Sequence, residues 1–402
     1  MSLRRSCYVS PGRSSASRFD TIKKREESRV LLLGCGAVGA VVARHLAASS
    51  LVRTIVAADM DPERSKALAR VVSPRKVRPL RLDLREEGAL ATAARGSSLI
   101  VNAAHPKFNL PVMKAALETT ADYLDLAGGG KDQLALHGKW RRAGRSALLG
   151  MGEDPGLSNV FARHAADALD EVTTVRIRDG ETARSEVYPV VLLFSPEVFI
   201  EETLAPAIVF EGGRWKKLPP FRGREDFPFP PPVGAVPVYH VSHEEVETLP
   251  RFLPKRPRYV DFKLALLPDT VRWLRWLKRV RWNRPKVREA ILSLIPPPGA
   301  LAGRISGHAA ILVEVTGRRD GVAATHTVWT ALDHARARRH GATATSWITG
   351  TSAAVGSLLL LDHEVPPGVV VPEQLDPASV FARLKGRDIE IRERVTRIRR
   401  LS

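Results

Sequence analysis

The sequence has little cysteine, no long apolar run and none of the usual metal-binding spacings. Two cysteines in 402 residues, Cys7 and Cys35, cannot form a disulfide framework, which favours a reducing cytoplasm. No apolar run reaches the roughly 20 residues that a transmembrane helix requires. The eleven histidines are scattered, with neither His-x-x-x-His nor Cys-x-x-Cys spacing, so we expect no metal site. Gly-x-Ser-x-Gly is also absent, which argues against a serine-hydrolase nucleophile.

Acidic residues are in deficit. There are 62 Lys and Arg against 43 Asp and Glu, a formal net charge of +19 that attracts anions such as nucleotides, carboxylates, nucleic acids and acidic lipids. The basic residues are scattered among acids, without helix-turn-helix, zinc-finger or aromatic ribonucleoprotein signatures, so we expect no specific nucleic-acid binding. Residues 1–28 lack an apolar signal core. They predict a disordered leader, with an Arg- and Ser-rich targeting peptide as the alternative.

A glycine-rich turn is the most informative feature that is present. The apolar residues 30–33 run into Gly34-Cys-Gly-Ala-Val-Gly39, and a helical stretch follows at once. In this pattern the first glycine permits a tight turn, the second leaves room for a pyrophosphate, and the third lets helix and strand pack closely. The helix N-terminus then offers free N–H groups to phosphates. The pattern predicts a dinucleotide site, with an unliganded turn as the alternative; its residues are Gly34, Gly36, Ala37, Val38 and Gly39.

Further residues are assigned to the same cofactor. Asp59 ends the next strand, twenty residues after the last glycine, where a carboxylate can bind the adenosine ribose 2′-OH. It would repel a 2′-phosphate, and Arg64 is the only nearby cation to offset it, so the sequence favours NAD over NADP. Asp83 follows the third strand and is placed near the adenine. Asn102 and Ala103 end the fourth strand, where the nicotinamide half can lie against the backbone, although a plain strand-end turn also explains Asn102.

Strands and helices alternate from residue 29 to 150, which predicts a Rossmann-type, doubly wound parallel sheet covered on both faces. The expected strands are 30–34, 54–59, 78–82, 98–104, 122–126 and 146–150, and the expected helices are 37–49, 63–71, 86–95, 108–119 and 131–143. Beyond a turn near residue 152 we expect antiparallel strands at 171–178, 189–194, 207–210, 309–316 and 323–329. The change predicts an α+β domain over 151–345, followed by a segment, 346–402, that returns to the first domain.

Residues 267–290 combine tryptophan with basic residues. Trp273, Leu274, Trp276, Leu277 and Val280 can share one helix face, with arginine and lysine on the other. Such a helix at 271–288 can lie on a membrane surface, or it can pack its apolar face on its own domain or on a second subunit.

The order of several motifs resembles the saccharopine dehydrogenase-like family, in the branch that contains lysine 6-dehydrogenase. The order holds from about residue 29 to 391. The motifs are the glycine turn, Val101-Asn-Ala-Ala104, Asp122-Tyr-Leu-Asp-Leu-Ala-Gly128, Gly152-Glu-Asp-Pro-Gly-Leu-Ser-Asn159, Glu247-Thr-Leu-Pro250 and Gly368-Val-Val-Val-Pro-Glu373. The resemblance implies a Rossmann domain joined to an α+β substrate and dimerisation domain, a homodimer, and nicotinamide-dependent hydride transfer at a C–N bond of an amino acid such as lysine or saccharopine.

Oxidation of an amine requires an unprotonated nitrogen, so some group must accept its proton. The catalytic candidates are Asp125, Asp154 in the interdomain turn, and the pair His243 and Glu245. If 242–248 is extended, alternate residues from His243 to Glu247 share one face. Each candidate also has an ordinary reading, as a loop cap, a turn residue or a solvated edge strand.

Three residues are predicted to contact the substrate: Tyr123, Glu247 and Arg251. Arg251 could pair bidentately with a substrate carboxylate. The main hypothesis is an NAD-dependent amino-acid dehydrogenase. The alternative is a catalytically silent nucleotide-binding protein at a membrane surface or on a partner, which the basic 271–288 segment and the net charge motivate.

Overall fold

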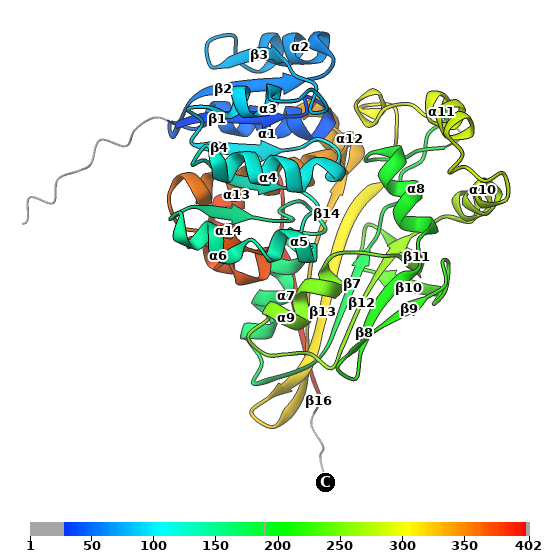
Figure 1. Ribbon diagram of the computed structural model, residues 1–402. Helices are drawn as coiled ribbons and strands as arrows, with labels where there is room; N and C mark the ends of the chain where they lie inside the picture. Colours follow the sequence, from blue (N-terminus) through cyan, green and yellow to red (C-terminus); the bar gives the residue numbers. More distant parts are fainter. Residues whose placement is uncertain (1–27, 189, 399–402) are drawn as a thin grey trace, which may run out of the picture.

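Two β-sheets with their flanking helices form the body of the molecule (Figure 1). The computed structural model describes residues 28–188 and 190–398. The predicted leader therefore lies outside the described residues, except for Ser28, which begins the first strand.

The first sheet is parallel, with seven strands in the order β15-β6-β5-β4-β1-β2-β3. Its inner strands β4, β5 and β6 are short runs that are buried throughout, as expected where helices cover both sides, whereas the edge strand β3 is largely exposed. This confirms the predicted Rossmann-type sheet. The strands are β1 (Ser28–Leu33), β2 (Val52–Asp59), β3 (Val77–Arg81), β4 (Leu99–Asn102), β5 (Asp122–Asp125), β6 (Ser146–Leu148) and β15 (Gly368–Val370).

The helices of this domain differ from prediction at two places. The expected helix 86–95 is shorter because Gly88 adopts a left-handed φ of 72°, which delays its start to Ala89. The expected helix 131–143 is two helices, separated by a tight turn in which the Leu136 N–H donates to the Gln133 carbonyl, 3.0 Å. The helices are α1 (Ala37–Ala48), α2 (Pro62–Val72), α3 (Ala89–Ala94), α4 (Asn109–Glu118), α5 (Lys131–Leu134) and α6 (His137–Arg142), with a 3-10 turn η1 (Pro106–Phe108).

The carboxyl-terminal segment contributes to both sheets. Helix α13 (Ala344–Leu361) packs closely on α1, because a Cβ at Gly350 would lie 2.6 Å from Val41. By length and composition α13 could cross a membrane, but 83% of it is buried inside the molecule, as in a core helix. Strand β15 then completes the first sheet. After η4 (Pro372–Gln374) and α14 (Pro377–Leu384), strand β16 (Arg392–Ile398) joins the second sheet beside β14.

The second sheet has nine strands, seven of them in the order β10-β11-β12-β7-β13-β14-β16, with β8 paired to β12 and β9 paired to β8. The predicted strand at 189–194 is wrong for residues 190–194, because Leu192 and Leu193 are buried in succession and lack strand alternation. The strands are β7 (Glu171–Asp179), β8 (Ala207–Glu211), β9 (Arg214–Leu218), β10 (Glu225–Phe229), β11 (Gly234–His240), β12 (Tyr259–Ala265), β13 (His308–Arg319) and β14 (Val322–Asp333).

The helices of the second domain lie around the upper end of its sheet and along its side (Figure 1). The helix that begins at Pro268 buries Val271, Leu274 and Leu277, so its apolar face packs on its own domain. The helices are α7 (Leu157–Asp167), α8 (Pro196–Leu204), α9 (Glu245–Phe252), α10 (Pro268–Arg279), α11 (Pro285–Leu294) and α12 (His334–Ala337), with the 3-10 turns η2 (Pro298–Leu301) and η3 (Arg338–His340).

Candidate active site

The glycine turn has the geometry of a phosphate cradle. Gly34 has a φ of 92°, and a Cβ there would lie 2.6 Å from the Ala103 carbonyl oxygen. A Cβ at Gly39 would lie 2.0 Å from the Gly34 carbonyl oxygen, so helix and strand meet only because both residues are glycine. By contrast, a Cβ at Gly36 would point into open space at the uncapped N-terminus of α1. This cradle fits the diphosphate of a dinucleotide.

Asp59 lies beside this turn. Its Oδ2 accepts a hydrogen bond from the Cys35 N–H, 2.8 Å, and its Oδ1 accepts from the Asp61 N–H, 3.0 Å. The carboxylate therefore holds the glycine loop in place and keeps lone pairs for a ribose hydroxyl. The nearby arginines have acidic partners, since Arg64 pairs with Asp61 and Arg81 with Glu86.

The other predicted cofactor residues lie along the same edge of the sheet. Asp83 follows β3, and Arg85 binds both of its oxygens and lowers its pKa to about 2. Asn102 is buried and bonds Asn109 and the Ala104 N–H, which matches the strand-end turn rather than an exposed ligand contact. Ala103 lines a cavity together with Val38 of the glycine turn.

That cavity, about 240 Å³, lies where the carboxyl ends of the first sheet meet the second domain. Hydrophobic side chains from the loop before α8, from α8 itself and from the end of β12 form one wall. These include Leu192, Leu193, Phe194, Val198, Phe199, Phe262, Leu264 and Leu266.

Carboxylates form the polar part of the cavity lining. Among the described residues that line it there is no lysine or arginine, and the only histidine is His243. The acids come from four separate parts of the second domain, namely the 152–156 turn, the end of β7, α8 and the start of α9. They are Asp154, Asp179, Glu181, Glu202 and Glu244.

Crowding of these acids in a buried site makes their negative charge costly. Burial raises the pKa of Asp179 to about 7 and that of Glu202 to about 8. Burial, with Asp179 beside it, holds the pKa of Asp154 well above its usual range. The Oδ2 atom of Asp154 is buried and accepts no hydrogen bond from a described N–H or hydroxyl group, although its carboxyl lies within hydrogen-bond reach of that of Asp179. A cationic group in the cavity would offset the excess negative charge of this pair.

Glu181 is held in a fixed orientation. The Thr345 hydroxyl donates to its Oε2, 2.6 Å, and His334 Nε2 lies 3.0 Å from its Oε1. Because the His334 Nδ1 accepts from the Ala344 N–H, its Nε2 must be the donor to Glu181. The N-terminal end of α13 thereby positions one carboxylate of the cavity.

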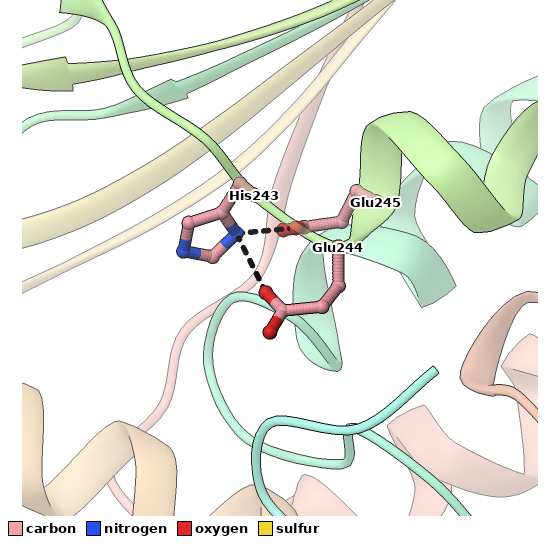
Figure 2. Close-up of side chains that lie close together, drawn as sticks. All are labelled: His243, Glu244 and Glu245. Atoms are coloured by element: carbon pink, nitrogen blue, oxygen red, sulfur yellow. Dashed lines mark hydrogen bonds and ion pairs between the residues drawn. The ribbon is translucent and has the colours of Figure 1, made fainter. Parts of the chain in front are cut away.

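His243, on the loop that leads into α9, faces Glu244 and Glu245, the N-cap and the first residue of that helix (Figure 2). The condition that 242–248 is extended does not hold from Glu245 onward, because α9 begins there. The ring stacks on Phe262, 3.9 Å between centroids, and its Nδ1 bonds Glu245. Burial opposes a charged ring, but the carboxylate of Glu245 outweighs it and raises the pKa of His243 to about 10. His243 is therefore an imidazolium at neutral pH and not a free base.

The ligand atoms of His243, Glu244 and Glu245 lie within 4.8 Å of one another, close enough for a metal ion. The sequence search for metal spacings missed this group because its residues are consecutive. The Nδ1 atom of His243 already bonds Glu245, whose other oxygen accepts from the Ser158 hydroxyl, 2.8 Å. These bonds favour a proton-handling role for the group.

Hydrogen bonds connect Glu245, through Ser158 and Asn159, to Glu373 in the carboxyl-terminal segment. Asn159 donates to Glu373 of η4, 3.0 Å, and burial raises the pKa of Glu373 to about 7. Ser158 and Asn159 belong to the first turn of α7, directly after the turn that carries Asp154. One short segment thus supplies a cavity acid and the groups that orient Glu245.

Asp125 and Tyr123 share one face of β5, as their spacing predicts, but neither lines the cavity. Both are fully buried. Asp125 accepts from the Tyr123 hydroxyl, 2.9 Å, from Gln133 Nε2, 2.8 Å, and from the Gly150 N–H, 2.7 Å. This bonding is that of a structural clamp in which both carboxylate oxygens already accept hydrogen bonds, so it does not support the catalytic role predicted for Asp125 or the substrate contact predicted for Tyr123.

Glu247 and Arg251 also lie away from the main cavity. They form an ion pair along α9, 3.9 Å, and the Arg251 guanidinium covers the ring of Trp215. Glu247 lines a neighbouring surface pocket beside Gly129 instead. Because the chain becomes helical at Glu245, alternate residues of 242–248 do not share one face as they would in a strand. Neither Glu247 nor Arg251 lines the cavity.

Sequence reasoning missed four of the five cavity acids. Asp179 and Glu181 flank a glycine at the end of β7. Polar residues at strand ends served as site candidates in the first domain, so the same criterion could have found these two acids. Glu244 was passed over because only alternate residues were selected. Only one feature of the sequence could have indicated Glu202. It is an acidic residue in α8 among residues that pack in the interior.

The model of the saccharopine dehydrogenase NADP binding domain matches residues 30–148, and that of the saccharopine dehydrogenase C-terminal domain matches residues 152–389. The chain belongs to the saccharopine dehydrogenase family. It is therefore an NAD(P)-dependent oxidoreductase of that family, acting on CH–NH groups.

Relatives within the saccharopine dehydrogenase family carry names with polyamine components. The chain is 30% identical to a carboxyaminopropylagmatine dehydrogenase of Synechocystis over 381 residues, which covers 89% of this chain and 95% of the relative. It is 28% identical to a carboxynorspermidine synthase of Vibrio cholerae, over 69% of this chain and 73% of the relative. These names do not point to lysine or saccharopine as the substrate.

Solved structures of the family support the fold. Saccharopine dehydrogenase of Saccharomyces cerevisiae superposes with a TM-score of 0.69 at 16% identity, covering 92% of this chain and 100% of that one. A homospermidine synthase of Legionella pneumophila in complex with NAD gives a TM-score of 0.71 at 16% identity, covering 92% of each chain.

Proposed function

We propose that this protein transfers hydride at a C–N bond of a substrate that carries several cationic nitrogens, a polyamine or a carboxylated polyamine. The observation that carries the proposal is the lining of the cavity. A chain of net charge +19 gathers five carboxylates there and no lysine or arginine among the described lining residues. Acids are rarely buried together without counter-charge, so the missing cations are expected to come from the substrate.

The apolar wall fits the same class of substrate. Methylene chains between the nitrogens of a polyamine can lie against Leu192, Phe194 and Phe199 while the nitrogens reach the acids. The only cation that the described lining offers is the His243 imidazolium, which Glu245 already balances, so the five lining acids favour a molecule with more cationic than anionic groups. The polyamine components in the names of two relatives support this class over lysine and saccharopine.

The cavity acids are suited to move the proton that the chemistry requires. A nicotinamide, when bound, accepts or supplies the hydride at the carbon next to nitrogen. The substrate nitrogen must lose a proton before oxidation, and Asp179 and Glu202, with pKa values of about 7 and 8, can accept and return one near neutral pH. Glu181, held in place by Thr345 and His334, can stabilise the positive charge of the iminium. His243, held protonated by Glu245, supplies a fixed N–H donor.

We propose NAD as the preferred cofactor. The Asp59 carboxylate beside the glycine turn would repel a 2′-phosphate, and the nearby arginines Arg64 and Arg81 are paired with acids, which supports this preference. Replacement of Asp59 by Asn should raise the Kd for NAD about tenfold, because a charged acceptor of the ribose hydroxyls is lost, and should narrow the preference over NADP. Fluorescence titration of both dinucleotides measures this, and an unchanged NAD affinity contradicts the placement.

Absorbance at the NADH band tests the function. The panel contains diamines, polyamines, their N-carboxyalkyl derivatives, lysine and saccharopine with NAD or NADP, and the reverse reaction pairs each amine with an amino-acid aldehyde and NADH. We expect turnover with substrates that carry at least two cationic nitrogens. Turnover confined to lysine, saccharopine or neutral amines would overturn the proposed substrate class.

The predicted cytoplasmic homodimer stays a prediction. All seven residues of β16 are exposed, so one edge of the second sheet is available to another copy. Light scattering of the full chain measures its mass in solution, and a monomer at micromolar concentration argues against the dimer.

A further inference from the structure

A second region of the molecule also carries strong charge, but its charge is positive and exposed, unlike that of the cavity acids. Helices α10 and α11, with the turn between them, project at the outer side of the second domain (Figure 1). We call residues 268–295 the basic hairpin. It contains eight Lys and Arg against two Asp and Glu, a net charge of +6 in 28 residues. About a third of the excess positive charge of the chain is thus placed in one surface feature.

Most of this charge is free. Within the basic hairpin Arg272 pairs with Asp269, and Arg288 pairs with Glu197 and Glu201 of α8. The other six cations form no ion pair with any described residue. They are Arg275, Lys278, Arg279, Arg281, Arg284 and Lys286.

Exposed apolar side chains accompany the free cations. The face of α10 that bears Val271, Leu274 and Leu277 is buried in the domain, so what remains exposed is the opposite face. There Trp276 is 50% exposed among arginines, and at the end of α11, which buries none of its residues, Leu294 is 83% exposed. Packing on the protein's own core therefore explains one face of the helix, whereas on the other face the Arg275 guanidinium lies over the Phe221 ring and Trp276 stays half exposed among the described residues.

We propose that the basic hairpin docks the enzyme on an anionic lipid surface. Lysine and arginine near such a surface each contribute about 1 kcal/mol, and tryptophan partitions into the headgroup region. A polynucleotide would satisfy the cations, but an aliphatic Leu294 has nothing to gain from a phosphate backbone, whereas it gains from burial among acyl chains. The inference is independent of the cavity, because none of the free cations lines it.

Co-sedimentation of the full chain with vesicles of phosphatidylserine and phosphatidylcholine (3:7), and with phosphatidylcholine alone, tests the proposal. We expect binding to the first and not the second. The variant Lys278→Gln/Arg279→Gln/Arg284→Gln should weaken the partition coefficient at least tenfold, and Trp276→Ala severalfold. A matched control, Arg214→Gln/Lys217→Gln/Arg222→Gln, removes the same charge from exposed positions elsewhere and should bind like the parent.

Oxidoreductase activity of every variant should equal that of the parent, which separates failure of this proposal from failure of the proposed function. Equal weakening by the control triple would show that only net charge matters and would overturn the assignment to the basic hairpin. Binding to phosphatidylcholine alone, no binding at all, or tighter binding of a single-stranded RNA that displaces the vesicles would overturn it as well.

Discussion

The cavity and the basic hairpin hold opposite charges under opposite conditions. In the cavity, five carboxylates are crowded beneath the surface, and burial raises the pKa values of Asp154, Asp179, Glu202 and Glu244. In the basic hairpin, six exposed cations that pair with no acid in residues 28–188 or 190–398 lie in water, where charge costs little and salt screens it. The difference teaches where charge is informative. A group of buried acids without a matching number of cations indicates a cationic ligand. Exposed basic residues indicate a binding surface only together with a second observation, which here is the exposure of Trp276 and Leu294.

Neutralising one cavity acid should give the largest effect. Glu202→Gln keeps the shape of the side chain but removes a charge that we assign to a substrate nitrogen. We expect kcat/KM for the cationic amine to fall about 100-fold, as is typical when a buried charge loses its partner. Steady-state kinetics measures this, with the exposed Glu211→Gln as the control. Equal rates for both variants would remove Glu202 from the site.

Salt should affect the two regions differently. Raising NaCl from 50 to 200 mM should weaken vesicle binding by the basic hairpin about tenfold, because exposed charges are screened beyond about 10 Å. The KM for the cationic substrate should change less than about threefold, since the cavity acids are buried. Parallel titrations measure both, and a KM that rises as steeply as vesicle binding falls would mean that the cavity acids are open to solvent.

Glu245→Gln should lower the pKa of His243. The carboxylate raises that pKa to about 10 against the effect of burial, so without it burial should prevail and leave the ring neutral near pH 7. We expect the alkaline limb of the kcat profile to move down by at least one pH unit. Glu247→Gln, on the same helix but outside the cavity, should leave the profile unchanged. An unmoved limb in Glu245→Gln would exclude His243 from the proton chemistry.

Removing Asp179 should stabilise the protein while reducing its activity. The folded-state pKa of Asp179, about 7, lies above its ordinary value of 3.8, so the folded protein binds the extra proton. Its unfavourable contribution therefore grows as pH rises from about 4 through 7 and is complete above that. Asp179→Asn should raise Tm at pH 8 by about 2–4 °C and have little effect at pH 4. Calorimetry at both pH values decides it, and a lower Tm at pH 8 contradicts the assignment.

The sequence predicts the first domain better than the site. Apolar strands, the glycine turn and Asp59 are local signals, and all of them lie in the structure where they were expected. The cavity, by contrast, joins Asp154, Asp179, Glu202 and Glu244 from elements up to 90 residues apart. Nothing in the sequence near Glu202 indicates that α8 faces the end of β7, because this contact depends on how the domains pack. At 242–248 the alternation of His243, Glu245 and Glu247 is compatible with a strand, but this segment enters helix α9.

The return of the chain to the first sheet has a consequence for how the molecule can be assembled and divided. The seventh strand of the dinucleotide-binding sheet, β15, is translated about 220 residues after β6, its only neighbour in that sheet. A fragment ending near residue 150 would leave the β6 edge bare and α1 without α13 against it. The first domain therefore cannot complete its fold during synthesis until nearly the whole polypeptide has emerged. Cleavage between the two domains should yield two fragments that aggregate and have no activity.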